Sequence, residues 1–264
     1  MIALVAGKGD IVIDVLNFYK NNLYVVAFEN ISEEKLKNYK NVIWFSKIDI
    51  YKVIKFLKEK NINKVFFLGK FDQKLTFKNI AFNFSTIRLL LSLKDKRPEK
   101  IFEKIKNILK ENGILVTYPQ EYIKHALASE EDIIGKFSKK EYENAKYGHK
   151  IAKFLATNDI GQTVVLKDKV VLALEAIEGT DETILRAGKL VKTGGLMVCK
   201  AAREHQTWEF DIPAVGLKTL ETMKKAKANT LVLEKNKVLI INKESFKRAC
   251  KENKIKLLVL DISS

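Results

Sequence analysis

The stretch MIALVAGKGDIVIDVLNFYKNNLYVVAF, residues 1–28, decides the fold of the first half of this chain. It places the apolar run 2–6 before a segment with helical periodicity and a second apolar run, 23–28, after that segment. Two strands joined by a helix of this length form a parallel pair with a crossover. The stretch therefore predicts the beginning of a Rossmann-like parallel sheet.

The same alternation continues beyond this opening. Apolar runs at 41–46 and 64–69 flank an amphipathic segment, and a mostly helical stretch follows from 75 to 112. The short run ILVTYP then has the composition of one more strand. We therefore predict an α/β fold whose N-terminal Rossmann-like domain covers residues 1–125.

The second half has a different pattern. A helical segment at 139–157 leads into two apolar runs separated by Asp168–Lys169, as in a β-hairpin, and the sequence around Asn236 has the same form. Further strands and helices follow. These features predict a C-terminal α/β domain with a mixed sheet over residues 135–264, joined to the first domain through 121–135.

Composition limits the functional classes. The chain is 47% hydrophobic with three prolines, which is typical of a folded globular protein. Its two cysteines, Cys199 and Cys250, have no CxxC spacing, which favours a reducing, cytosolic compartment. No run reaches the roughly 18 consecutive apolar residues of a membrane span, so we expect no transmembrane helix.

The formal net charge of +16 calls for an anionic partner, such as nucleic acid, a phosphorylated substrate or the cytoplasmic face of a membrane. The lysines are spread through the helical segments and are not interleaved with aromatic residues in one block. Nucleic-acid binding would therefore rest on charge alone. We predict no nucleic-acid partner.

The motif AGKGD, residues 6–10, follows a strand and opens a helix, so the backbone amides of Gly7 and Gly9 could face a phosphate. Glu29 follows about 20 residues later, where dinucleotide-binding folds place a ribose-binding acid. The third glycine of that fingerprint is absent, because Val12 occupies its position. A tight turn, a phosphate contact and, less readily, NAD binding all fit this motif.

The segment EAIEGTDE, residues 175–182, gathers carboxylates at the end of an apolar strand. In one interpretation Thr180 caps a helix whose first turn carries Asp181, and Glu175 points outward. In the other interpretation Glu178 and its neighbours bind Mg²⁺ together with substrate phosphates. The pattern leaves both interpretations open.

In REHQTWEFDIPAVG, residues 203–216, Asp211 lies between apolar neighbours and shortly before a proline. A carboxylate in such surroundings is hydrogen-bonded, bound to metal or part of a turn. Lys200 and Arg203, just upstream, could meet phosphate oxygens, and His205 could be a ligand or a hydrogen-bond donor.

The segment NDIGQTVVL, residues 158–166, stands at the entry to the first hairpin. We interpret Gly161 as the stop of the preceding helix. His149 lies inside that helix without a second ligand at metal spacing, so we expect it to be structural.

In the order AGKG, NDIGQTVVL, VVLALEAIEGTDETILRAG and CKAAREHQTWEFDIPAVG, the chain resembles the LpxI-type UDP-2,3-diacylglucosamine pyrophosphatases over essentially its whole length. The resemblance implies a hydrolase of lipid A biosynthesis that cleaves UDP-2,3-diacylglucosamine to UMP and 2,3-diacylglucosamine 1-phosphate (lipid X). It implies Mg²⁺ as cofactor, with Mn²⁺ left open. It also implies a cytoplasmic enzyme, peripherally associated with the inner membrane whose cytoplasmic leaflet holds the substrate; a homodimer is left open.

The resemblance also assigns residues. The family's essential aspartate, in its RFDxPxxG motif, falls on Asp211, and the motifs EAIEGTD and DIGQ fall on Glu175, Glu178 and Gln162. We therefore expect catalytic roles for Asp211 and Glu178, and metal binding by Asp211, Glu178 and Asp181. The expected substrate-binding residues are Gly7, Gly9, Gln162, Thr180, Lys200 and Arg203.

The chain departs from the family where AKPxQDxRFD is usual and AREHQTWEFD occurs here. Glu209 replaces a basic residue, which leaves Lys200 and Arg203 as the phosphate contacts. Two alternatives stay open at this point. One is an NAD(P)-dependent oxidoreductase, and the other is a non-enzymatic basic protein that binds nucleotides or membranes.

Overall fold

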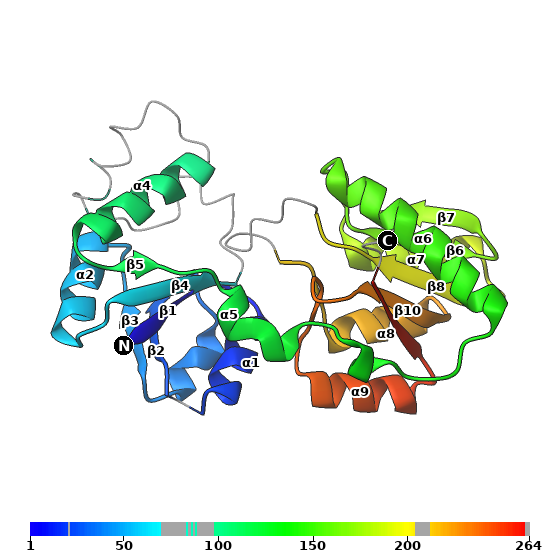
Figure 1. Cartoon of the computed structure of the whole chain (residues 1–264), viewed down its shortest axis with the longest axis horizontal. Helices are drawn as coiled ribbons and strands as arrows, with labels where there is room; N and C mark the ends of the chain where they lie inside the picture. The colour runs from blue at the N-terminus through cyan, green and yellow to red at the C-terminus, as the bar shows by residue number, and fades with distance from the viewer. Residues whose placement is uncertain are drawn as a thin grey trace. The chain divides into compact units, whose positions relative to one another are not determined.

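The computed structural model describes residues 1–20, 22–69, 83, 86, 88, 98–203 and 212–261. The chain divides into two compact units between Tyr122 and Ile123, and each unit has its own sheet (Figure 1). Much of the mostly helical stretch expected over 75–112 lies outside the described residues, as do both His205 and Asp211.

The sheet of the N-terminal unit is entirely parallel among its described strands, in the order β3-β2-β1-β4-β5. This order runs outward from β1 in both directions, as in doubly wound folds. The prediction of a Rossmann-like parallel sheet is therefore confirmed. The strands are β1 (Ile2–Ala6), β2 (Tyr24–Phe28), β3 (Val42–Phe45), β4 (Lys64–Leu68) and β5 (Leu115–Val116).

Apolar side chains on the strands and helices explain why this unit holds together. The buried residues Val53 and Leu57 of α2 and Phe102 of α4 belong to one core cluster with strand residues of β1 and β4. The polar segment after β2 forms a short 3-10 turn, η1, rather than an α-helix. The helical elements are α1 (Asp10–Phe18), η1 (Glu34–Asn38), α2 (Ile50–Glu59), α4 (Pro98–Glu111) and α5 (Gln120–Ile123).

The C-terminal unit contains a mixed sheet in the order β12-β10-β8-β6-β7, as the second half of the sequence predicts. Strands β8, β10 and β12 are parallel, and β6 runs antiparallel to β8 and β7. A separate small sheet pairs β9 with β11. The strands are β6 (Thr163–Lys167), β7 (Val170–Leu174), β8 (Leu196–Lys200), β9 (Ala214–Val215), β10 (Ala228–Glu234), β11 (Leu239–Ile240) and β12 (Lys256–Leu260).

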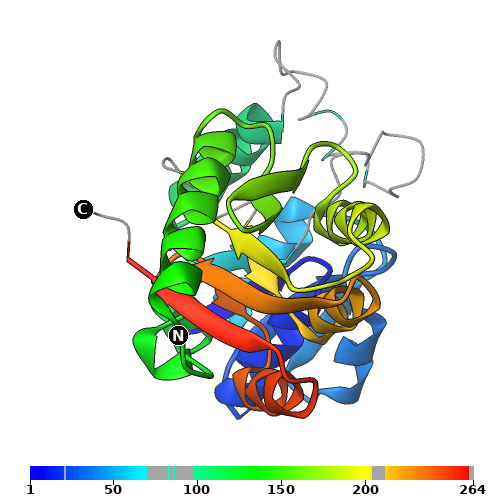
Figure 2. The same cartoon turned by 90° about the vertical axis from the view of Figure 1, so that its right-hand side faces the viewer.

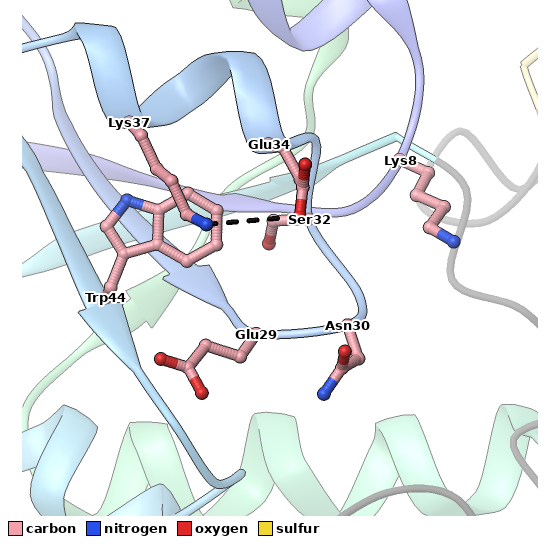
Figure 3. Close-up of a pocket in the computed structure, with 7 residues that line it drawn as sticks. All are labelled: Lys8, Glu29, Asn30, Ser32, Glu34, Lys37 and Trp44. Carbon is pink, nitrogen blue, oxygen red and sulfur yellow. Dashed lines mark ion pairs between the residues drawn. The ribbon is translucent and has the colours of Figure 1, made fainter.

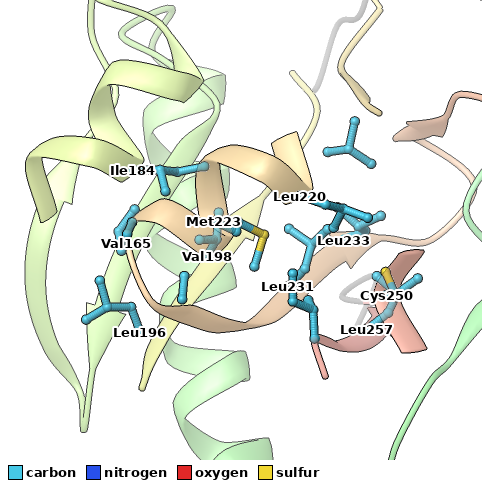
Figure 4. Close-up of a cluster of buried hydrophobic side chains, with 14 of the residues drawn as sticks. Val165, Ile184, Leu196, Val198, Leu220, Met223, Leu231, Leu233, Cys250 and Leu257 are labelled. Carbon is cyan, nitrogen blue, oxygen red and sulfur yellow. The ribbon is translucent and has the colours of Figure 1, made fainter. Parts of the chain in front are cut away.

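Helices cover both faces of this mixed sheet (Figure 2). The green helix α6 packs on the face that carries Val164, and α7, α8 and α9 pack on the face that carries Val165. Figure 4 shows the core on the face that carries Val165, in which Met223 of α8 lies among residues of the sheet. The helices are α6 (Lys139–Thr157), α7 (Thr180–Leu190), α8 (Leu217–Lys225) and α9 (Lys243–Glu252), and short 3-10 turns occur at Lys124–Ala126 and Glu130–Asp132.

The two predicted hairpins have different outcomes. The turn at Asp168–Lys169 is confirmed, since both residues have positive φ, 48° and 62°, and β6 pairs antiparallel with β7. The prediction of a hairpin around Asn236 is wrong. Strand β10 is paired on both edges by the parallel strands β8 and β12, so no edge remains for the segment after Asn236, which forms β11 in the small sheet.

None of the helices within the described ranges is long and apolar enough to span a membrane.

Candidate functional site

One edge of the mixed sheet collects several of the polar residues singled out in the sequence. Lys200 ends β8 and Glu175 directly follows β7, while Gln162 directly precedes β6. Because β6 is antiparallel to both β7 and β8, its first residues lie beside the last residues of those strands. The helix α7 begins at Thr180 close to the same edge.

A buried lysine is at the centre of this edge. Lys200 is 4% exposed, and its Nζ donates hydrogen bonds to Thr180 Oγ1 at 2.8 Å and Thr163 Oγ1 at 3.2 Å. Thr180 Oγ1 in turn donates to Glu175 Oε1 at 2.9 Å, and Lys200 Nζ lies 4.0 Å from the other carboxylate oxygen. We call Gln162, Thr163, Glu175, Thr180 and Lys200 the Lys200 cluster.

The cluster contradicts two parts of the first interpretation of the carboxylate-rich segment, the cap at Thr180 and the outward direction of Glu175. The residue at the N-cap of α7 is Gly179, with φ of 85°, so Thr180 is not the cap. Its hydroxyl instead links Lys200 to Glu175. The expectation that Glu175 points outward is also wrong, because its side chain is 12% exposed and accepts the Gln162 N–H at 3.2 Å.

Gln162 has an unmet hydrogen-bonding group. Its side-chain Nε2 is buried and has no hydrogen-bond partner among the described residues, and the residue is 9% exposed. A buried donor without an acceptor costs about 1–3 kcal/mol. An acceptor oxygen of a bound molecule would remove that cost.

Gly161 has a packing role and not the predicted helix-stop role. Helix α6 ends with Asn158 at its C-cap. A Cβ atom on Gly161 would lie 2.1 Å from the carbonyl oxygen of Glu175, so only glycine permits this close approach.

Glu178 and Asp181, the described residues expected to bind metal, are both engaged by cations. Glu178 Oε1 accepts from Arg186 Nη2 at 2.6 Å and from the Thr183 hydroxyl at 3.2 Å. A hydrogen bond from its own backbone N–H, followed by that from Arg186, holds the pKa of the Glu178 carboxyl below its ordinary value. Asp181 pairs with Lys218 at 2.9 Å, which raises the pKa of that lysine.

The ion pairs of Glu178 and Asp181 bear on whether this edge of the sheet can hold a metal ion. Within the part of the chain that the structure describes, no group of three or more His, Cys, Asp or Glu residues could hold a metal. Glu178 and Asp181 are neutralised by their own partners, and Asp211 lies outside the described residues. The described carboxylates therefore do not form a preformed metal centre.

A second polar network fixes the backbone just after Lys200. Glu234, at the end of β10 and 5% exposed, accepts from the Ala202 N–H at 2.8 Å and from Lys153 Nζ at 2.9 Å. Lys153 also donates to the Ala202 carbonyl at 2.9 Å. Burial opposes ionisation of Glu234, but the hydrogen bonds from Lys153 and Ala202 outweigh it, and its pKa is lowered.

Sequence reasoning missed Glu234, although an acid that ends the apolar run TLVLE was a visible signal. The network lies between Lys200 and Arg203, the latter of which pairs with Asp159 at 2.9 Å. It holds the backbone N–H and the backbone carbonyl of Ala202 and so orients the chain on each side.

The glycines of AGKGD have internal partners. The Gly7 N–H donates to the Leu68 carbonyl at 2.8 Å, and the Gly9 N–H donates to Glu33 Oε1 at 2.8 Å. The start of α1 therefore already holds a carboxylate from its own chain. Glu33 had no distinguishing signal in the sequence, because it is one of several acids in a polar segment.

Glu29 lies beside a hollow of about 480 Å³ in the N-terminal unit, which is also lined by Lys8, Asn30, Ser32, Glu34, Lys37 and Trp44 (Figure 3). The hollow is found at the carboxyl ends of β1 and β2, since Lys8 and Glu29 follow these strands. Trp44 and Lys37 were not singled out in the sequence.

Comparison with known proteins identifies similar chains. Residues 1–126 match the LpxI N-terminal domain, and residues 131–258 match the LpxI C-terminal domain. A curated relative, the UDP-2,3-diacylglucosamine pyrophosphatase LpxI of Caulobacter vibrioides, is 29% identical over 103 residues. That match covers 36% of this chain and 36% of the relative.

Proposed function

Because this chain belongs to the LpxI family, whose two domains match it in succession, we propose that it hydrolyses UDP-2,3-diacylglucosamine. In the proposed reaction water attacks one phosphorus of the pyrophosphate, and the bond between the bridging oxygen and that phosphorus breaks. The products are UMP and 2,3-diacylglucosamine 1-phosphate, lipid X. This reaction would place the chain in lipid A biosynthesis.

The Lys200 cluster is the observation that supports the proposal best. A pyrophosphate carries negative charge that repels a nucleophile, and it gains more charge as the bridging bond breaks. A buried ammonium acts strongly on such charge because the surrounding dielectric is low. Lys200 and Thr163 are buried at the back of the cluster, and Thr180 is partly exposed at its front.

Gln162 adds a donor to this arrangement. We assign its unpaired Nε2 to a phosphoryl oxygen of the substrate, with Lys200 supplying positive charge behind it. The Thr180 hydroxyl, whose single hydrogen is donated to Glu175 in the structure, would turn from that carboxylate to the same phosphoryl oxygen. The start of α7 contributes a favourable dipole at the same edge. Arg203, three residues after Lys200, is assigned to the same phosphates.

Asp211 is assigned to the reacting water or to a metal ion, with Glu178 or Asp181 in support, on the family resemblance of its motif. Mg²⁺, or Mn²⁺ in its place, would neutralise charge on the substrate phosphates when bound. Since the described carboxylates do not form a metal centre by themselves, no step of the reaction is assigned to the ion.

The proposal includes a location. A net charge of +16 suits an enzyme that works at the anionic cytoplasmic leaflet of the inner membrane, where its lipid substrate resides. We propose peripheral association there, and vesicles with and without anionic lipid would test it by co-sedimentation.

The decisive experiment measures UMP and lipid X by mass spectrometry after incubation of the full chain with UDP-2,3-diacylglucosamine, with Mg²⁺ and with a chelator. Variants Asp211→Asn and Lys200→Met should lose turnover. Lys189→Met, which changes an exposed lysine on α7, should retain it. Reaction in ¹⁸O-labelled water would show which product carries the label and hence which phosphorus is attacked.

Intact substrate in every sample, from protein with a cooperative unfolding transition, would overturn the proposal. Turnover that persists in the chelator would overturn the proposed metal dependence but would still support the proposed hydrolysis.

A further inference from the structure

The hollow of the N-terminal unit has the position and size of a ligand site. In doubly wound sheets, ligands bind outside the carboxyl ends of the strands. Lys8 follows β1, Glu29 follows β2, and Trp44 belongs to β3, so the hollow opens at that edge (Figure 3). Its volume of about 480 Å³ lies within the range of small-molecule pockets.

Trp44 supplies an aromatic surface to this hollow. The ammonium of Lys37 lies 5.6 Å from the centre of the indole ring and 3.9 Å from Glu34 Oε1, its ion-pair partner. Figure 3 shows the lysine chain extending over the tryptophan. A flat ring with carbonyl oxygens can pack against an indole and accept a hydrogen bond from a lysine. The bases of nucleotides combine these two properties.

Glu29 and Asn30 supply hydrogen-bonding groups on the opposite side of the hollow from Lys37 (Figure 3). The Glu29 carboxylate makes no hydrogen bond or ion pair with any residue that the structure describes. A carboxylate at the end of the second strand can accept hydrogen bonds from ribose hydroxyls. Asn30 has a positive φ of 65°, which marks the tight turn that carries the pair.

The phosphate of such a ligand needs a cation. The usual place, the N-terminus of α1, is taken by Glu33, whose carboxylate accepts the Gly9 N–H. Lys8 lines the hollow, is exposed, and forms no ion pair within the described part of the chain. Its ammonium is therefore the group that a phosphate at this edge would meet.

The loop that carries these residues is anchored. The buried Ser32 hydroxyl donates to the Ala6 carbonyl at 2.6 Å and accepts the Phe28 N–H at 2.9 Å. It thereby ties the end of β1 to the end of β2. The hollow is thus largely formed without a ligand.

We propose that this hollow binds a nucleoside monophosphate unit, with its base against Trp44 and Lys37, its ribose hydroxyls on Glu29 and its phosphate on Lys8. The nucleotide class follows from the hollow itself. The choice of uracil rests on the proposed function, in which UMP is a product.

Calorimetric titration of the full chain with uridine and with UMP tests the assignment. Trp44→Ala should weaken both ligands about tenfold or more, because stacking of a base on an aromatic residue contributes that order of affinity. Trp44→Phe should retain most of the affinity. Lys8→Met should weaken UMP but leave uridine unchanged, and Glu29→Gln should weaken uridine more than 2′,3′-dideoxyuridine.

Tyr118→Ala is the matched control. Tyr118 is 60% exposed in the same unit, has the ammonium of Lys106 5.8 Å from its ring centre, and does not line this hollow. This variant should bind both ligands like the wild type. Equal loss in Tyr118→Ala and Trp44→Ala, or UMP affinity that no variant at the hollow changes, would overturn the inference.

The experiments distinguish failure of this nucleotide site from failure of the proposed function. Hydrolysis with UMP affinity indifferent to Trp44, Lys8 and Glu29 would overturn this site alone. UMP binding that depends on these residues, without hydrolysis of UDP-2,3-diacylglucosamine, would support the site and overturn the activity. Trp44→Phe and Lys8→Met keep the test valid if Trp44→Ala fails to fold.

Discussion

Lys200 Nζ lies 2.8 Å from Thr180 Oγ1, so the end of strand β8 and the first residue of helix α7 share one hydrogen bond. The same hydroxyl donates to Glu175. A single threonine thus connects a buried cation to a carboxylate at the sheet edge, and this connection can be tested directly.

Thr180→Val removes the hydroxyl and keeps the shape of the side chain. We expect kcat/KM for the proposed hydrolysis of UDP-2,3-diacylglucosamine to fall by about a hundredfold, the order found when one group that stabilises developing charge is removed. Thr180→Ser should retain most of the activity, since it keeps the oxygen. Wild-type kinetics in the valine variant would exclude this hydroxyl from the reaction.

Gly161→Ala tests the close contact between the entry to β6 and the end of β7. The added methyl would meet the Glu175 carbonyl at 2.1 Å, so the backbone must shift and move Glu175 and Gln162 with it. We expect a loss of unfolding free energy of about 1–3 kcal/mol and a larger fractional loss of activity. Ile160→Ala, at an exposed neighbour, should change neither quantity appreciably.

Glu234→Gln tests the network that holds the Ala202 peptide. The change leaves Lys153 and Lys237 without their carboxylate partner, and loss of one member of a buried ion pair costs about 3 kcal/mol. Urea unfolding measures that cost. Glu130→Gln, which removes an exposed pair with Lys235, is the control and should leave the urea midpoint unchanged.

His149 should make stability depend on pH. It is fully buried on α6, and neither ring nitrogen has a hydrogen-bond partner among the described residues. Desolvation is the largest cause that lowers its pKa to about 4. The charge of Glu234 opposes this shift, whereas the charges of Lys153 and Lys237 add to it. The unfolded chain takes up a proton below pH about 6.5, whereas the folded chain does so only near 4. The stabilisation is therefore present above pH 6.5 and is lost as pH falls toward 4.

Chemical unfolding at pH 7.5 and 5.0 measures this effect. We expect the wild type to lose about 2 kcal/mol more than His149→Leu between these two values. An equal loss in both proteins would show that His149 does not carry the dependence.

Much of the fold could be predicted because the pattern that specifies it is local. The alternation of apolar runs and amphipathic segments over residues 1–69 predicts the parallel sheet, and Asp168–Lys169 predicts the hairpin through residues that accept positive φ. The same kind of local signal gave a wrong prediction of a hairpin at Asn236. Two apolar runs around a turn residue resemble a hairpin, but which strand occupies an edge depends on residues far away in the chain.

By itself, the sequence determined the order of strands and helices, the absence of a long apolar span and, through its motifs, the family of the chain. Only the tertiary structure decided which polar groups meet: Lys200 with Thr180, Gly9 with Glu33, Glu234 with Ala202, and Lys37 with Trp44. The physical reason is range. Periodicity and turn preferences act within a few residues, whereas these contacts join residues that are 7 to 32 positions apart in the sequence. They form only when the fold brings those residues together.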